Sequence, residues 1–233
     1  SVNTTLIFLK ACLKYGHRQY KLPVPDFSYL SETKKEKRVL SLEEQKKLVS
    51  YLSTEPDIYK FGVLLTLYTG LRIGELCALR WSDIEGSCIR IRQTMQRLRK
   101  NNEKGTELHI GAPKTDTSVR CIPIPSFLLE RLEYFRKLGN GQEYFLGERG
   151  QPIAEPRIMQ YKFKKYLEEA GVAKANFHAL RHSFATRCIE LGFDVKSLSE
   201  ILGHANIQTT LACYVHSSFE LKQSNMELLS KIS

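Results

Sequence analysis

The sequence has few of the features that mark a secreted protein. It contains only six cysteines, at Cys12, Cys77, Cys88, Cys121, Cys188 and Cys213. No two of them form a Cys-x-x-Cys pair, which argues against a zinc finger or ribbon, and their low density argues against a small disulfide scaffold. Most have apolar neighbours, which predicts reduced core residues of an intracellular protein.

Long hydrophobic stretches and targeting signals are also missing. The longest apolar run, residues 61–68, is far shorter than the roughly 20 residues that a membrane-spanning helix needs. No basic segment followed by an apolar one opens the sequence, so no secretion signal is predicted. We therefore expect a globular protein located in the cytoplasm.

Positive charge is what the sequence has in excess. Its 233 residues include 35 Lys and Arg against 25 Asp and Glu, a formal net charge of +10. The hydrophobic share of 42% is ordinary for a folded domain, so disorder as the main state is not expected. The charge favours a polyanionic partner, with nucleic acid first and an anionic membrane surface second. It does not specify a reaction.

Hydrophobic periodicity predicts a mainly α fold with a small antiparallel β-sheet (α+β). Segments 88–92 and 120–124 alternate between apolar and polar residues, as paired strands do. Segments 101–105 and 114–118 between them are rich in turn residues. The predicted helices span residues 5–15, 41–52, 57–69, 72–79, 126–138, 155–170, 178–191, 195–202, 207–215 and 219–229.

The chain is expected to consist of three parts. Residues 1–22 resemble a remnant, since a single helix cannot bury its own apolar face. Residues 23–38 form a basic linker, extended at its prolines, and residues 39–233 form the main domain. The linker is either simply solvated or contacts a nucleic-acid backbone through its cluster of cations, Lys34, Lys35, Lys37 and Arg38.

The first segment that suggests chemistry is Thr-Gly-Leu-Arg-Ile-Gly-Glu-Leu at residues 69–76. Gly70 ends one predicted helix, and Arg72 falls in the first turn of the next. A helix N-terminus attracts anions, and a guanidinium matches two phosphate oxygens. Glu75 shares the face of Arg72 and can hold it in place. The alternative is an ordinary surface ion pair of little energetic value.

The second segment is His-Ala-Leu-Arg-His-Ser-Phe at residues 178–184. His178 and Arg181 are three residues apart and therefore share a helix face. Such a pair suits a phosphate, because Arg binds the oxygens while His donates a hydrogen bond or moves a proton. A zinc site at His178 and His182 is disfavoured, since it lacks the Glu of His-Glu-x-x-His and an Arg would repel the cation.

Three more residues complete a chemical set. His204 follows the helix-ending Gly203 at an expected exposed corner, Tyr214 lies ten residues further on, and Lys114 lies in the turn-rich segment 114–118. Metal-free phosphodiester cleavage requires fixed positive charge on the phosphate oxygens, a nucleophile such as a phenol, and an acid for the leaving alkoxide. No acidic cluster for two metal ions and no phosphate-binding loop are visible. We therefore expect neither a metal nor another cofactor.

In this arrangement the sequence resembles the tyrosine recombinases, also called the phage integrase family, and among them the integrases of bacterial conjugative transposons and temperate phages. The resemblance extends from about Val39 to the C-terminus. It rests on several spaced matches in the right order, at residues 69–76, 112–120 (with Lys114, Ser118 and Arg120), 178–182, 202–204 and Tyr214.

The resemblance implies the tyrosine recombinase catalytic-domain fold and a site-specific recombinase that uses neither metal nor ATP. Glu75 would support the site. The implied catalytic roles are clamping of the scissile phosphate by Arg72 and Arg181, a hydrogen bond to it from His204, proton movement by His178, protonation of the leaving 5′-hydroxyl by Lys114, and formation of a 3′-phosphotyrosyl bond by Tyr214.

The resemblance also implies partners. They are the double-stranded DNA of the element ends and the target site, and three further copies of the chain in a tetrameric synapse that passes through a Holliday junction on bacterial DNA. The predicted helix 219–229 would pack on a neighbouring copy or on its own domain. Further candidates for contacts with the DNA backbone are Arg90, Arg92, Arg97, Arg99 and Lys100.

One departure from the family plan and two rival functions remain at this point. Members of the family carry a helical core-binding domain before the catalytic one, and only residues 2–20 could represent its last helix, so we expect a fragment. The rival functions are DNA relaxation of the type IB topoisomerase kind, which shares the chemistry, and DNA binding by a regulator that has lost catalysis.

Overall fold

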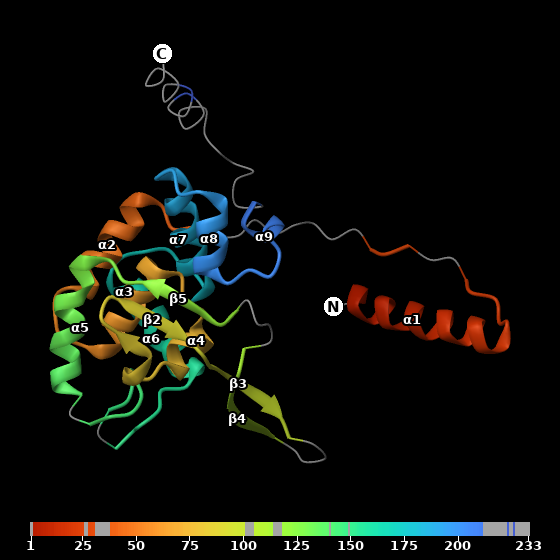
Figure 1. Ribbon diagram of the computed structural model, residues 1–233, viewed down its shortest axis with the longest axis horizontal. Coiled ribbons are helices and arrows are strands. Elements are labelled where there is room, and N and C mark those ends of the chain that lie inside the picture. The colour runs from red at the N-terminus through yellow and green to blue at the C-terminus, as the bar shows by residue number, and fades with distance from the viewer. Residues whose placement is uncertain are drawn as a thin grey trace. The chain divides into compact units, whose positions relative to one another are not determined.

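The structure is a computed structural model (Figure 1). It describes residues 2–25, 28–30, 38–100, 105–113, 118–139, 141–148 and 150–211, together with Gln223 and Met226. The chain divides into two compact units, Ser1–Glu36 and Lys37–Ser233. Within the described ranges, no helix combines the length and the apolar character needed to cross a membrane.

The first unit contains the helix α1, Val2–Tyr20, which is longer than the predicted segment 5–15. None of its residues is buried. The side-chain amide of Asn3 ties the following segment back to the helix: its Nδ2 donates to the carbonyl of Leu30 (2.9 Å) and its Oδ1 accepts from the amide of Leu30 (3.0 Å).

The second unit is built around α3, Ile58–Thr69, in which ten of twelve residues are buried. It begins at Asp57, whose carboxylate accepts from the amides of Tyr59 and Lys60. Around it lie α2 (Leu42–Leu52), α4 (Ile73–Ala78), α5 (Ser126–Leu138), α6 (Pro156–Glu169) and α7 (His178–Glu190). The capping box predicted by Ser41 and Glu44 opens α2.

The strands form two separate antiparallel sheets. After a short 3-10 helix, η1 (Trp81–Asp83), the strands β1 (Ile84–Glu85), β2 (Cys88–Ile91) and β5 (Arg120–Pro123) pair in the order β1-β2-β5. The strands β3 (Thr94–Arg99) and β4 (Thr106–Gly111) form a hairpin that projects from the body of this unit (Figure 1).

The hairpin was not predicted, whereas β2 and β5 were. In β3 only Met95 is buried, and Leu98 on the opposite face is exposed. A strand that is largely exposed on both faces has no reason to alternate apolar with polar residues, and so it carries no period-two signal. The mainly helical fold with small antiparallel sheets is confirmed.

A small apolar cluster holds the last helices in place. Besides the main core, Ala185, Cys188 and Ile189 of α7 pack with Leu198 and Leu202 of α8 (Val195–Leu202). This contact seats the C-terminal end of α8 against α7. After it comes α9 (Gln208–Leu211). The rest of the predicted helix 207–215 and nearly all of 219–229 lie outside the described residues, although Gln223 and Met226 are helical.

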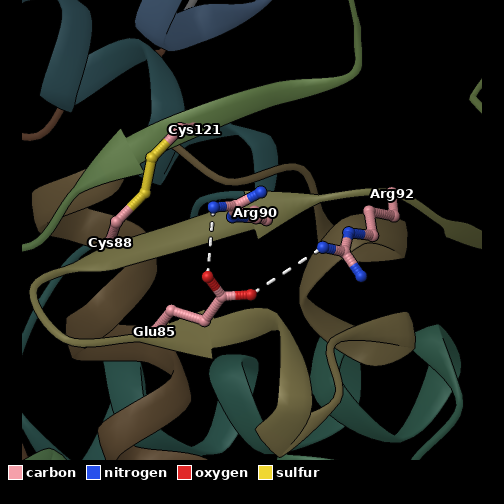
Figure 2. Close-up of a disulfide and its surroundings, with 5 residues drawn as sticks. All are labelled: Glu85, Cys88, Arg90, Arg92 and Cys121. Atoms are coloured by element: carbon pink, nitrogen blue, oxygen red, sulfur yellow. Dashed lines mark ion pairs between the residues drawn. A yellow bond between two sulfur atoms is a disulfide. The ribbon is translucent and has the colours of Figure 1, made fainter.

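Two cysteines differ from the prediction that most cysteines of the chain are reduced core residues. Cys88 and Cys121 form a disulfide between β2 and β5, with their Cα atoms 6.1 Å apart (Figure 2). Cys88 faces Pro123 and Cys121 faces Arg90 in the antiparallel register, so the two cysteines are diagonal neighbours on adjacent strands. The prediction that they are reduced core residues is wrong, because apolar sequence neighbours do not reveal a contact across a sheet.

The other cysteines differ in their environment. Cys77 and Cys188 are buried and free, as predicted, and burial raises the pKa of the Cys188 thiol to about 12. Cys12 is exposed rather than buried. It lies in α1, none of whose residues is buried. Cys213 lies outside the described part of the chain.

We predict that reduction of the Cys88–Cys121 disulfide destabilises the second unit. The bridge closes a loop with a sequence separation of 33, for which the chain-entropy model gives about 3–4 kcal/mol. Urea unfolding with and without a thiol reductant should show this loss. The double variant Cys88→Ser/Cys121→Ser is the control and should not respond to the reductant. Equal unfolding midpoints of the wild type under both conditions would contradict the prediction.

Candidate active site

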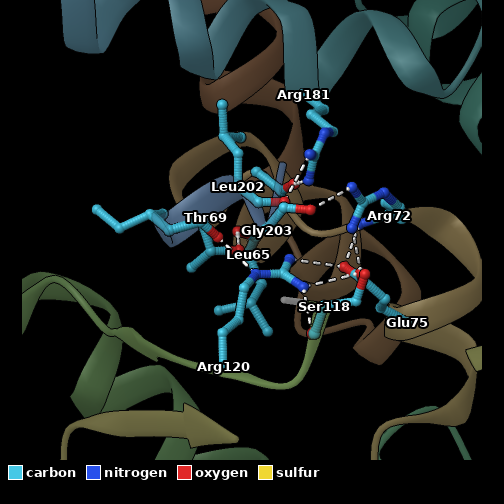
Figure 3. A network of polar contacts seen from close by, with 11 residues as sticks. Leu65, Thr69, Arg72, Glu75, Ser118, Arg120, Arg181, Leu202 and Gly203 are labelled. Atoms are coloured by element: carbon cyan, nitrogen blue, oxygen red, sulfur yellow. Dashed lines mark hydrogen bonds and ion pairs between the residues drawn. The ribbon is translucent and has the colours of Figure 1, made fainter. Parts of the chain in front are cut away.

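Three arginine side chains converge on the C-terminal end of α8 (Figure 3). Three consecutive carbonyls each accept from a different arginine: Ile201 O from Arg120 Nε (2.6 Å), Leu202 O from Arg181 Nη2 (2.6 Å) and Gly203 O from Arg72 Nη2 (3.0 Å). The last carbonyls of a helix lack intrahelical donors and carry the negative end of its dipole. They are therefore well suited to bind guanidinium groups.

Arg72 is placed by the break between α3 and α4. Gly70 ends α3 with φ of +67°. The sequence predicted Arg72 in the first turn of the next helix, whereas the structure places it at the N-cap of α4, just before that turn. A Cβ on Gly70 would lie 2.6 Å from Cδ1 of Phe184. Glycine is therefore required both by the backbone and by the close approach of α7.

Arg181 is buried, with an exposed fraction of 3%. Its Nη1 donates to the carbonyl of Gly70 (2.7 Å) and its Nη2 to that of Leu202 (2.6 Å). Both carbonyls belong to helix C-termini, those of α3 and α8. The guanidinium thus joins two helix ends, which partly compensate its buried charge.

Glu75 is the acidic partner of this cluster and is 2% exposed. Its Oε1 accepts from Nη1 of Arg72 (2.7 Å) and Nη1 of Arg120 (2.9 Å), and its Oε2 accepts from the amide of Arg72 (2.8 Å) and Nη2 of Arg120 (2.9 Å). Burial alone would raise the pKa of this carboxyl, but the hydrogen bonds and charges of Arg120 and Arg72 outweigh burial and lower it.

The charges within the cluster do not balance. Arg72, Arg120 and Arg181 contribute +3 and Glu75 contributes −1, which leaves +2 among these bonded side chains. Arg72 remains 34% exposed at its side chain and can reach a ligand. An anion with several oxygens, such as a phosphate, fits this excess.

The histidines lie on α7 and beyond α8. His178 is the exposed first residue of α7, and its ring meets that of His182 edge-on, with 4.6 Å between centroids. His204 directly follows the turn at Gly203. It is half-buried rather than exposed at a corner, because its Nδ1 contacts the hydroxyl of the buried Thr210 at 2.8 Å. This contact orients the ring.

Other predicted site residues fall outside the described residues, namely Lys114, Tyr214, Lys34, Lys35 and Lys37. Among the residues that are described, no group of three or more His, Cys, Asp and Glu is arranged to hold a metal ion.

Most of the predicted backbone-binding cations that the structure describes contact carboxylates. Arg99 and Lys100 are exposed at the end of β3. The ion pairs join Arg38 to Glu44, Arg90 to Glu85 (3.1 Å), Arg92 to Glu85 (3.8 Å) and Asp83 (3.9 Å), and Arg97 to Glu155 (2.8 Å). Figure 2 shows Glu85 between its two arginines. These side chains would have to exchange a carboxylate for a phosphate to bind DNA.

Sequence reasoning missed Arg120 as a site residue and noted it only within the family match. One signal could have found it. Arg120 precedes Ile122 and Ile124 by two and four residues, so the three share one face of an extended strand. The two isoleucines are buried, at 1% and 5% exposure. A charged residue on the inward face of a strand needs a buried partner.

We predict that Gly203→Ala disturbs the cluster through contact as well as backbone strain. Gly203 has φ of +62°, and an added Cβ would lie 2.9 Å from Cδ of Arg120. Gly171 is the matched control, because its φ is +64° and an added Cβ meets nothing within 4 Å. Thermal unfolding should show about 1 kcal/mol of destabilisation for Gly171→Ala from strain alone, and a clearly larger loss for Gly203→Ala. Equal losses would contradict the assigned contact.

We also predict an acid-dependent contribution from Glu75. Its pKa in the folded protein lies below the ordinary value of 4.5, so its stabilising effect is present above that value and is lost as the pH falls through the folded pKa. Glu75→Gln should lower the free energy of unfolding by about 3 kcal/mol at pH 7. The difference in this free energy between the variant and the wild type should narrow below pH 4.5. Urea unfolding at several pH values measures this. The control is Glu130→Gln, at an exposed position of α5. Its free energy of unfolding should be close to that of the wild type at every pH.

Comparison with known proteins identifies the family of the chain. The model of the phage integrase family matches residues 38–220. A tyrosine recombinase XerC-like protein of Caldanaerobacter subterraneus subsp. tengcongensis is 35% identical over 189 residues, which cover 72% of this chain and 48% of that protein. The tyrosine recombinase XerA of Pyrococcus furiosus is 35% identical over 175 residues, with 73% and 54% covered. The chain spans about half the length of these curated relatives.

Solved structures show the same likeness. The Tn1549 transposon integrase in complex with transposon right end DNA superposes with a TM-score of 0.77 at 25% identity, covering 95% of this chain and 76% of that one. The same integrase in complex with circular intermediate DNA gives a TM-score of 0.72 at 27% identity, covering 95% and 77%. With the family model covering most of its length, the chain belongs to the phage integrase family, the tyrosine recombinases.

Proposed function

We propose that this chain carries the strand-cleaving centre of a site-specific DNA recombinase, the integrase of a mobile element, which works through a 3′-phosphotyrosyl intermediate without metal or ATP. The observation that carries the proposal is the excess of positive charge at the end of α8, where Arg72 and Arg181 are held by helix-end carbonyls and Glu75. This arrangement fits a phosphate whose two non-bridging oxygens gain charge in the transition state.

The described residues have different tasks in this proposal. Arg181 is buried and bonded on two sides, so it provides positive charge whose position is set before the substrate arrives. Arg72 is partly exposed and binds the second non-bridging oxygen. His204, oriented by Thr210, donates a hydrogen bond to the same phosphate. Such preorganised donors need little rearrangement at the moment of reaction.

The proposed bond changes add two residues that lie outside the described part of the chain, Tyr214 and Lys114. The phenol oxygen of Tyr214 attacks phosphorus and loses its proton with the help of His178, while the bond from phosphorus to the 5′ oxygen breaks and Lys114 protonates that oxygen. Attack by a 5′-hydroxyl of the partner strand on the phosphotyrosyl bond reverses these steps. The phosphodiester energy is kept in the ester, so no ATP is needed.

The partners proposed are double-stranded DNA and further copies of the chain. The Tn1549 integrase structures are complexes with DNA, which supports DNA as the substrate and a mobile element as its source. A tetrameric synapse, exchange of the segment 219–229 between copies, and action in the bacterial cytoplasm remain part of the proposal. So does the division into a core-binding remnant at 1–22, a linker at 23–38 and a catalytic domain at 39–233.

We predict that Tyr214→Phe abolishes the covalent adduct with DNA. The substrate is a duplex of the element end with a nick close to the scissile phosphate, so that the cleaved strand diffuses away and the phosphotyrosyl bond is trapped. Denaturing gels measure the adduct. The control is Tyr161→Phe on α6, at an exposed tyrosine, which should form adduct at the wild-type rate.

Other outcomes identify the rival functions. Binding without any adduct in the wild type would favour a non-catalytic regulator. Adduct formation with relaxation of a single supercoiled plasmid, and no recombination between two sites, would favour a type IB topoisomerase. An adduct in Tyr214→Phe equal to that in the wild type would refute the assigned nucleophile.

A further inference from the structure

Arg120 is buried in the active-site cluster but is placed so that it cannot itself receive a substrate. Its side chain is 6% exposed. Its Nε donates to Ile201 O, Nη1 to Glu75 Oε1 and to Ser118 O (3.1 Å), and Nη2 to Glu75 Oε2. These bonds engage four of the five N–H donors that a guanidinium has. Arg120 is therefore satisfied by the protein, in contrast to the partly exposed Arg72.

The fork of Arg120 fixes the carboxylate that holds Arg72. Two parallel hydrogen bonds of 2.9 Å join Nη1 and Nη2 to the two oxygens of Glu75. A bidentate pair of this kind sets the plane of the carboxylate as well as its position. The same two oxygens accept from Nη1 and the amide of Arg72. The orientation of Arg72 thus depends on how Arg120 holds Glu75.

Arg120 also fixes the second acceptor of Arg72. The guanidinium lies so close to Gly203 that an added Cβ there would meet Cδ, Nη1 and Nε of Arg120 at 2.9, 3.0 and 3.1 Å. Its bond to Ile201 O holds the turn from the other side. The carbonyl of Gly203 in turn accepts from Nη2 of Arg72. Arg120 therefore bonds one acceptor of the Arg72 side chain, Glu75, and packs against the residue that carries the other, Gly203. Figure 3 shows Arg72 and Arg120 on the two oxygens of Glu75.

The position of Arg120 along the chain adds a third connection. It is the first residue of β5, and its Nη1 bonds the carbonyl of Ser118, two residues earlier. Ser118 is also the last residue of the turn-rich segment 114–118, which contains Lys114. One side chain therefore links the end of that segment to α4 and to the turn after α8.

We propose that Arg120 is a positioning residue of the strand-cleaving centre, which holds the guanidinium of Arg72 through Glu75 and the turn at Gly203. It touches neither substrate nor reacting atoms. This inference rests on the proposed function for its catalytic consequence, but not for its structural one. The alternative is a purely structural role, in which Arg120 stabilises the fold and has no specific effect on Arg72.

The structural consequence can be tested without catalysis. A guanidinium whose two Nη groups are both bonded rotates slowly about its Nε–Cζ bond and gives separate proton signals for them in NMR spectra. The Arg72 signals are identified as those that Arg72→Lys removes. In Arg120→Met we expect the separate Arg72 signals to merge. The control is Arg136→Met, which removes an exposed arginine that also donates to a backbone carbonyl, that of Ile84 (2.8 Å), and should leave them separate.

The catalytic consequence is tested with the trapped adduct in single turnover. Arg120→Met should lower the rate of adduct formation about 100-fold, because a small misplacement of a phosphate-binding group has an effect of this size. Affinity for the duplex should change less than about threefold, since many other contacts to the DNA backbone remain. A residue that acts through Arg72 has no further effect once Arg72 is lost. The double variant Arg72→Met/Arg120→Met should therefore be as slow as Arg72→Met alone.

Each outcome is decisive. Arg72 signals that stay separate in Arg120→Met, or rate losses that multiply in the double variant, overturn the proposal. If Arg120→Met does not fold, Arg120→Lys replaces it, since lysine keeps the charge but loses the fork, and merged Arg72 signals with a slower adduct are again expected. If the wild type forms no adduct, the recombinase function fails, whereas the NMR comparison still decides whether Arg120 positions Arg72.

Discussion

The burial of three guanidinium groups beside a single carboxylate, which bonds only Arg72 and Arg120, is the constraint on which the rest of the site depends. Like charges at this distance repel, and burial makes the repulsion stronger. Glu75 balances one charge, and three successive carbonyls at the end of α8 accept one hydrogen bond from each arginine. The three arginines and Glu75 together carry a net positive charge. In the proposed function a phosphate binds there, so affinity for the substrate and stability of the site would have the same electrostatic origin.

The fold provides this cluster by ending two helices in the same way. Gly70 and Gly203 are both left-handed C-caps, with φ of +67° and +62°, and each helix end gives one carbonyl to Arg181, that of Gly70 and that of Leu202. The small apolar cluster between α7 and α8 holds the end of α8 against α7. The arginines come from a helix cap, a strand and a helix interior, so no local element contains the site. It exists only where α4, β5, α7 and α8 meet.

The cations of the chain fall into two physical groups. Those of the cluster are buried or half-buried, and their guanidinium groups converge on the end of α8. Arg90, Arg92 and Arg97 instead form ion pairs at the surface, where salt and water screen them. In the proposed function the net charge of +10 would attract DNA over a long range, while the chemistry would depend on the few side chains held by carbonyls at the end of α8.

The sequence by itself determined the fold class, most helix positions, the two glycine stops and the residue types of the site, because helical periodicity, capping and short motifs are local properties. Arg72 with Glu75, and His178 with Arg181, were found for that reason. Only the tertiary structure revealed the β3–β4 hairpin, the Cys88–Cys121 bridge and the place of Arg120. Each of these depends on contacts between residues far apart in the chain. The charge of a residue and the apolar character of its sequence neighbours do not reveal which distant group its side chain will contact.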